Sequence, residues 1–103
     1  MFDKVKLVNQ GLERRFPNGK DPFQIMTRIL EEGGELAQQV NHFEGSGSKR
    51  HKYGGPDRVK LAGEVKGLLL AAMQVVDYYG LEKELEESLD QSIRRLREQG
   101  FLE

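Results

Sequence analysis

The sequence predicts an all-α protein of four helices packed in a bundle-like domain. Apolar residues recur at steps of three and four along most of its 103 residues, which is the spacing of a helix that buries one face. Breaks rich in glycine and proline separate these stripes, and no segment is read as a strand. We therefore expect a single helical domain over residues 1–103, with a flexible loop at about 45–55.

The first two helices are separated by a short turn. The first covers roughly residues 2–15, and the turn at residues 17–19 ends it. Asp21 then caps the second helix, and Pro22 occupies its first position, where a missing amide hydrogen costs little. The apolar side of this second helix extends to Phe43.

The last two helices are separated by a glycine. Pro56 and Asp57 begin the third helix, which extends to about Tyr79 and is apolar around much of its circumference near its end. Several neighbours usually bury such a helix, and in so small a protein we expect some of them from another subunit. Gly80 ends it. The fourth helix carries Leu81, Leu85, Leu89, Ile93 and Leu96, with an acidic start and a basic end that suit the helix macrodipole.

Composition excludes several classes of function. A net charge of −1 argues against a general nucleic-acid binder, which needs a basic face. The absence of cysteine excludes disulfides and thiolate metal sites. The first residues lack the apolar centre of a signal peptide, and no apolar run reaches the roughly 20 residues of a membrane span. We expect a cytoplasmic protein with no membrane partner.

Four glutamates are the candidate functional residues of this chain. On the second helix, Glu35 lies four residues after Glu31 and three after Glu32, so Glu35 projects close to both. Glu64 lies among apolar residues of the third helix, and glutamate is almost never fully buried without a partner. Clustered carboxylates with no obvious cationic partner indicate a hard divalent cation.

Two ordinary interpretations compete with this one. The three glutamates of the second helix could form a solvated acidic face, which is common. Glu64 could form a surface ion pair with Lys60 or Arg58. A zinc site is not expected, because His42 and His51 have no partner at the usual ligand spacing.

The spacing of the glutamates resembles a known family. Glu-Glu-x-x-Glu at residues 31–35, followed by 28 residues and Glu64, is similar to the motif pair of the MazG-like, all-α nucleoside-triphosphate pyrophosphohydrolase superfamily. The stretch at residues 30–37 looks like the first motif helix of that family, and residues 61–81 look like the second and the turn after it. The resemblance covers roughly residues 21–97.

The resemblance implies an enzyme that hydrolyses an NTP or dNTP to the monophosphate and pyrophosphate. Glu32, Glu35 and Glu64 would hold Mg²⁺, with Mn²⁺ as an alternative, and Glu31 would orient the attacking water or hold a second metal ion. Members of this family hold the base between subunits, so the resemblance also implies a homodimer or homotetramer.

A basic run in the predicted loop is a further candidate for substrate binding. Lys49, Arg50 and Lys52 could fold over a triphosphate. More often such a run is only a solvated loop.

One position departs from the family pattern. The aspartate that follows the second-motif glutamate by three residues is replaced by Gly67, which offers no ligand and also suits tight helix packing. Asp77 projects from nearly the opposite side of the helix, and Asp57 is about two turns away. Water, substrate phosphate or a carboxylate of another chain could fill the position.

The glycine leaves two further interpretations open. The site could have decayed, leaving a homologue that binds metal or nucleotide as a sensor or assembly component. The chain could also be a helical interaction module without any site.

Overall fold

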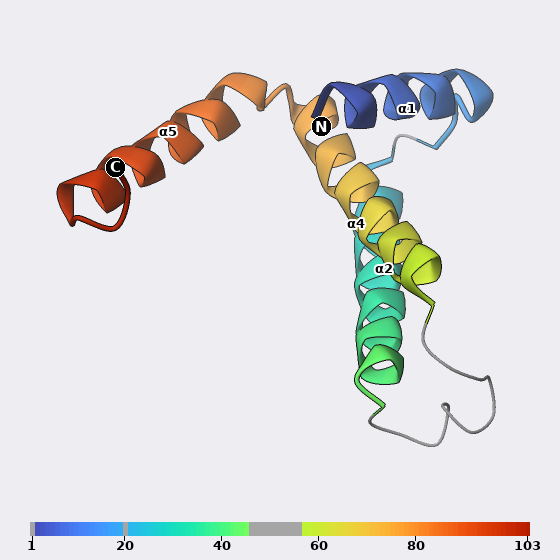
Figure 1. Ribbon diagram of the computed structural model, residues 1–103. Coiled ribbons are helices and arrows are strands. Elements are labelled where there is room, and N and C mark those ends of the chain that lie inside the picture. Colours follow the sequence, from blue (N-terminus) through green and yellow to red (C-terminus); the bar gives the residue numbers. More distant parts are fainter. Residues whose placement is uncertain (1, 20, 46–56) are drawn as a thin grey trace.

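The computed structural model describes residues 2–19, 21–45 and 57–103, and these residues form helices without a strand (Figure 1). The four helices are α1 (Phe2–Arg15), α2 (Pro22–Phe43), α4 (Arg58–Tyr79) and α5 (Glu82–Glu98). The predicted all-α class is confirmed. None of the described helices combines the length and apolar character that a membrane span requires.

Aspartates begin the two long helices. The Asp21 side chain accepts a hydrogen bond from the backbone N–H of Phe23 at 2.7 Å. The Asp57 side chain accepts two, from the backbone N–H groups of Val59 at 2.9 Å and Lys60 at 3.2 Å. Each carboxylate therefore satisfies backbone donors that have no partner within the helix, as a capping residue does.

Gly80 ends α4 and changes the direction of the chain. Its φ of 64° is left-handed, a conformation that glycine adopts without steric cost. The backbone N–H of Leu81 then donates to the Val76 carbonyl at 2.9 Å, which closes the end of the helix. The next helix starts only two residues later, so α5 leaves α4 in a new direction (Figure 1).

The core lies where α1, α2 and α4 meet. α2 and α4 pack along each other most extensively, and α1 packs on α4 (Figure 1). The buried apolar side chains are Val5, Ile25, Ala71 and Met73. α4 contacts each of the other three helices, which explains why its sequence is apolar around so much of its circumference.

α5 stands apart from the other helices. None of its residues is buried, and Figure 1 shows it projecting away from the end of α4. The radius of gyration is 17.1 Å, whereas a compact domain of this length has about 13 Å. Within one chain, the bundle-like packing predicted for four helices therefore involves three of them.

Candidate metal centre

Three carboxylates converge between α2 and α4. Glu32, Glu35 and Glu64 each offer one carboxylate oxygen, and these oxygens all lie within 4.8 Å of one another. Glu32 and Glu64 are half-buried, and Glu35 is exposed. The structure therefore brings together the three glutamates that the sequence indicated as metal ligands.

Helix geometry explains the convergence. Residues three apart on α2 lie on nearly the same side of the helix, which places Glu32 beside Glu35. The cross-helix pairs show that α2 and α4 run antiparallel, since Arg28 is bonded to Gln74 whereas Glu35 lies beside Glu64. Glu64 consequently meets the second half of the acidic motif.

Within the cluster, the Glu35 carboxyl group has a pKa above that of an isolated glutamate. A hydrogen bond between the carboxyl groups of Glu35 and Glu64 raises the pKa of Glu35 above its ordinary value of 4.5. The negative charge of Glu64 and partial desolvation raise the pKa of Glu35 further. A cation bound at the cluster would neutralise the repulsion between these carboxylates.

The Glu32 carboxyl group lies directly against Gly67. A Cβ atom at position 67 would lie 2.7 Å from Cδ of Glu32 and closer still to one of its oxygens. A Cβ at Gly63, one turn earlier on α4, would meet nothing within 4 Å. Gly67 therefore provides the space that the Glu32 carboxylate occupies, and a larger residue there would have to displace it.

The donor set and spacing suit a hard divalent cation. Carboxylate oxygens are the ligands that Mg²⁺ and Ca²⁺ prefer. Two oxygens on one ion are separated by at most about 4.2 Å for Mg²⁺ and about 5 Å for Ca²⁺, from their usual bond lengths. The oxygens of Glu32, Glu35 and Glu64 lie within 4.8 Å of one another. Small side-chain rotations would thus bring all three onto a single ion.

Other residues named from the sequence lie elsewhere. The Glu31 side chain is exposed and does not join the cluster; it lines a shallow depression between α2 and the turn after α1. Asp57 caps α4 and Asp77 lies toward the other end of that helix, so neither joins the cluster. The predicted flexible loop, with its substrate-binding candidates Lys49, Arg50 and Lys52, lies almost entirely outside the described residues.

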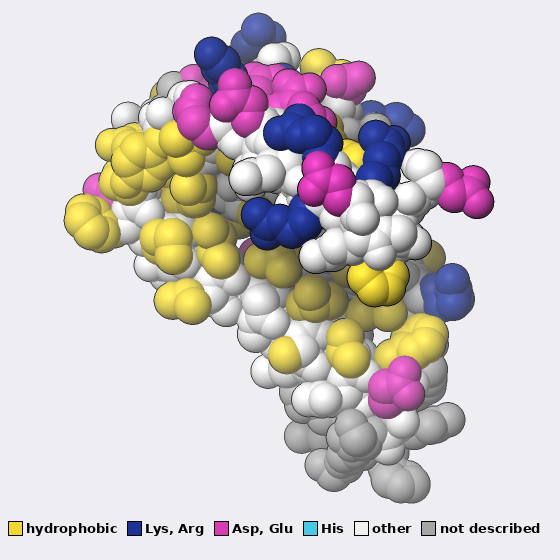
Figure 2. Space-filling model, turned by 90° about the vertical axis from the view of Figure 1, so that its left-hand side faces the viewer, with side chains coloured by type: hydrophobic (Ala, Val, Ile, Leu, Met, Phe, Trp, Pro, Cys, Tyr) yellow, Lys and Arg dark blue, Asp and Glu magenta, His cyan; other side chains and the backbone are white. Residues whose placement is uncertain are grey.

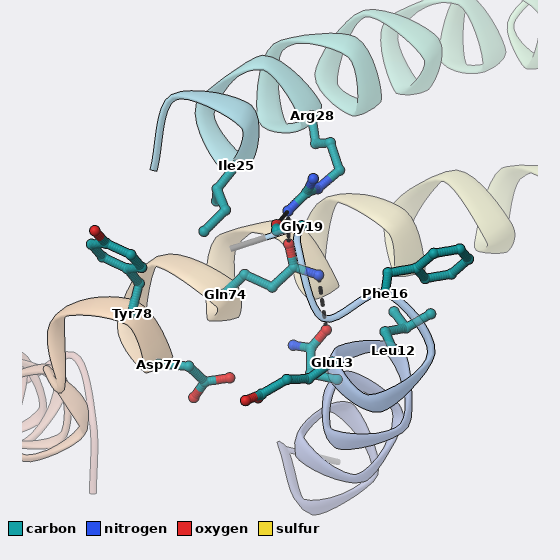
Figure 3. Close-up of a pocket in the computed structure, with 10 residues that line it drawn as sticks. Leu12, Glu13, Phe16, Gly19, Ile25, Arg28, Gln74, Asp77 and Tyr78 are labelled. Carbon is teal, nitrogen blue, oxygen red and sulfur yellow. Dashed lines mark hydrogen bonds between the residues drawn. The ribbon is translucent and has the colours of Figure 1, made fainter. Parts of the chain in front are cut away.

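A cavity of about 470 Å³ opens between α1, α2 and α4 (Figure 3). It combines apolar walls with polar side chains, and its volume lies within the usual range for small-molecule pockets. The lining residues are Asn9, Leu12, Glu13, Phe16, Gly19, Ile25, Arg28, Gln74, Asp77 and Tyr78.

A hydrogen-bonded network crosses this cavity. The buried Asn9 amide donates to the Leu70 carbonyl at 3.1 Å and accepts from Nε2 of Gln74 at 3.1 Å. Nη2 of Arg28 donates to Oε1 of Gln74 and to the Gly19 carbonyl, both at 2.9 Å. The network connects the three helices and fixes the Arg28 guanidinium at the cavity wall, as Figure 3 shows.

The far side of the cavity is acidic. Figure 3 shows the carboxylates of Asp77 and Glu13 pointing toward one another. Although Asp77 keeps a solvent-exposed edge, partial burial of its carboxylate is the main cause that raises its pKa. Lys6 lowers the pKa of Asp77, whereas the charges of Glu13 and Glu82 raise it further. Sequence reasoning did not identify this cavity.

The cavity and the carboxylate cluster lie along one seam between α2 and α4. Three cross-helix pairs line the seam in order: Arg28 with Gln74, Glu32 with Gly67, and Glu35 with Glu64. At 1.5 Å per residue, Glu32 is about 6 Å and Glu35 about 10 Å from Arg28 along the helix axis. One extended ligand could thus reach both places.

Comparison with known proteins assigns no family to this chain. The chain matches no family model, no curated protein and no solved structure. The candidate metal centre is therefore defined by its own geometry, the three converging carboxylates and the seam that joins them to the cavity.

Proposed function

We propose that this protein hydrolyses a nucleoside triphosphate or deoxynucleoside triphosphate to the monophosphate and pyrophosphate, with Mg²⁺ or Mn²⁺ as cofactor. The convergence of Glu32, Glu35 and Glu64 is the observation that carries the proposal. The motifs that supply these residues resemble those of the MazG-like superfamily, which supports the same reaction. On that resemblance the enzyme is a homodimer or homotetramer.

The cluster would bind the cation and orient the phosphates. Water adds across the anhydride between the α- and β-phosphates, and the products are the monophosphate and pyrophosphate. When bound, the metal ion neutralises phosphate charge and lowers the pKa of a coordinated water. Glu31 is the candidate for orienting the attacking water, or for holding a second metal ion. Most of the rate acceleration would come from positioning and electrostatics.

The seam offers a place for the rest of the substrate. We propose that the nucleoside part enters the cavity and that the Arg28 guanidinium faces the phosphates between the cavity and the cluster. Guanidinium groups match phosphate oxygens in charge and geometry. Lys49, Arg50 and Lys52 are further candidates for contacting the triphosphate.

Pyrophosphate release from a panel of NTPs and dNTPs tests the proposal. We expect release with Mg²⁺ or Mn²⁺ from the wild-type chain and release at background for Glu35→Gln, which removes one ligand charge. Glu44→Gln is the matched control, because Glu44 is exposed at the C-terminal end of the same helix. An equal loss of pyrophosphate release in Glu35→Gln and Glu44→Gln would contradict a specific role for the cluster.

Gly67 supports a second candidate function. Because it offers no fourth carboxylate, the chain could bind metal or nucleotide without turning it over, as a sensor or assembly component. Calorimetry separates the two: Mg²⁺-dependent nucleotide binding without pyrophosphate release favours the second function. Absence of both binding and release would leave a helical interaction module.

A further inference from the structure

Asp77 presents hydrogen-bond acceptors to the cavity that the chain itself does not use. Its carboxylate lies on the acidic side of the cavity, opposite the Arg28 guanidinium (Figure 3). No described residue donates a hydrogen bond to it, and Lys6 acts on it only through its charge. Both carboxylate oxygens can therefore accept hydrogen bonds from a ligand in the cavity.

The environment of Asp77 differs from that of a typical surface carboxylate. On the face that Figure 2 shows, acidic side chains are interspersed with those of Lys and Arg. Water and nearby opposite charges stabilise the ionised form of such groups. Around Asp77, partial burial and the charges of Glu13 and Glu82 disfavour the ionised form and raise its pKa. A ligand that donates hydrogen bonds to this carboxylate would offset that cost.

Gln74 offers a donor three residues before Asp77 on α4. Arg28 can only donate and the Leu70 carbonyl can only accept, so the two amides between them have a single orientation. Oε1 of Gln74 therefore faces Arg28, and Nε2 uses one of its two hydrogens for Asn9. The second hydrogen remains for a ligand. Residues three apart on a helix are neighbours, so this donor and the Asp77 carboxylate share one part of the cavity wall.

The other walls of the cavity suit a flat ring. They are formed by apolar side chains, two of them aromatic: Leu12, Phe16, Ile25 and Tyr78. Planar heterocycles bury their faces against such side chains and stack on aromatic ones. The cavity is therefore complementary to a planar ligand whose edge presents N–H donors to Asp77 and an adjacent acceptor to Gln74.

We propose that the cavity selects guanine among the nucleobases. This rests on the proposed function, which places the nucleoside part of the substrate in the cavity. The two adjacent donors of guanine, N1–H and the 2-amino group, would meet the two oxygens of Asp77, and the neighbouring O6 would accept from Nε2 of Gln74.

The other common bases fit this pair of side chains less well. Adenine and cytosine carry an acceptor nitrogen beside their amino group, and uracil and thymine carry a carbonyl group on each side of their single N–H. Each of them would place an acceptor against an oxygen of Asp77. A buried acceptor left without a donor weakens binding, so the carboxylate discriminates against all four.

Calorimetric titration with nucleoside monophosphates tests this selection. We expect the wild-type chain to bind guanosine monophosphate about ten-fold or more tightly than inosine monophosphate, which lacks only the 2-amino group. Monophosphates contain no anhydride bond, so the result does not depend on hydrolysis. Equal affinity for the two, or no binding of guanosine monophosphate, would overturn the proposal.

Asp77→Asn should exchange one preference for another. The new amide keeps an acceptor for N1–H and gains a donor, which suits xanthine because a carbonyl replaces its 2-amino group. We expect the variant to bind guanosine monophosphate more weakly and xanthosine monophosphate more tightly than the wild-type chain does. Asp90→Asn is the matched control, since Asp90 is exposed on α5. An unchanged preference in Asp77→Asn, or a loss of both affinities, would refute recognition by Asp77.

Pyrophosphate release separates this proposal from the proposed function. Equal kcat/KM for GTP and UTP would leave the hydrolase in place and remove guanine selection. Absence of release from every triphosphate, with tighter binding of guanosine than inosine monophosphate, would refute the hydrolase and retain guanine selection.

Discussion

Substitution of Gly67 by aspartate probes the most constrained contact of the candidate metal centre. The new side chain would enter the space of the Glu32 carboxylate, with its Cβ only 2.7 Å from Cδ of Glu32 in the present arrangement. Because the obstructing atoms are the far end of a flexible side chain, Glu32 can rotate away without a backbone shift. The variant should therefore fold, with four carboxylates around one point in place of three.

The cost without metal follows from electrostatics. Two carboxylates about 4 Å apart repel by about 1 kcal/mol in water and about 4 kcal/mol at the effective dielectric of a protein surface. Because Glu32 is half-buried, we expect a loss of on the order of 2 kcal/mol, of which better helix propensity recovers only a few tenths. A loss of that size lowers the melting temperature of a small domain by about 10 °C.

Bound Mg²⁺ should restore the stability that Gly67→Asp loses in the absence of metal. A fourth carboxylate should tighten Mg²⁺ binding by about ten-fold or more, and ligand at about 100 times its dissociation constant contributes about 2.7 kcal/mol. Thermal melts with EDTA or with Mg²⁺, together with calorimetric titration, measure both effects. Gly63→Asp is the control, since nothing lies within 4 Å of its Cβ position. Identical behaviour of the two variants would refute the placement of Glu32 against Gly67.

Three further predictions concern stability. In EDTA, the free energy of unfolding should fall as the pH rises from 4.5 through the raised pKa of Glu35, because the native chain retains a proton that the unfolded chain releases. Urea titrations at several pH values measure this, and the free energy of unfolding should depend less on pH for Glu35→Gln than for the wild-type chain. Asn9→Ala should cost about 1–3 kcal/mol in urea denaturation, because it leaves Nε2 of Gln74 without its acceptor and removes the bond to the Leu70 carbonyl, whereas exposed Gln10→Ala should change stability by less than about 0.5 kcal/mol. Asp77→Asn should raise the melting temperature at pH 7 more than at pH 4, because it removes a partly desolvated negative charge whose pKa is raised from 3.8; an equal rise at both pH values would contradict this cause.

Local chemistry made the helices predictable from the sequence. Asp21 and Asp57 cap helices because a short carboxylate can reach the next backbone amides, and this depends only on neighbours in the chain. Gly80 ends α4 because glycine accepts a left-handed conformation. The ends of α2 and α4 therefore lie close to where the sequence placed them.

The parts that the sequence did not predict depend on distant residues. The Asn9–Gln74–Arg28 network needs α1 to cross α4 at a particular place, and its members lie 46 and 65 residues apart. The contact of Glu32 with Gly67 likewise depends on the spacing of two packed helices. The sequence showed that glycine replaces the family aspartate at position 67, but it could not show that the Glu32 carboxylate occupies the space. Helix spacing placed Glu32 beside Glu35, and the apolar surroundings of Glu64 indicated a partner for it, whereas the assignment of these three residues as one ligand set came from the resemblance to a family.

The turn at Gly80 separates the last helix from the carboxylate cluster. Glu64 precedes Gly80 by sixteen residues, so the cluster lies about 24 Å along α4 from the point where the chain turns into α5. The three converging carboxylates accordingly come from α2 and α4, and α5 supplies none of them. Saturation by Mg²⁺ should follow a simple hyperbola with a Hill coefficient of about 1, because the described residues form one such cluster per chain.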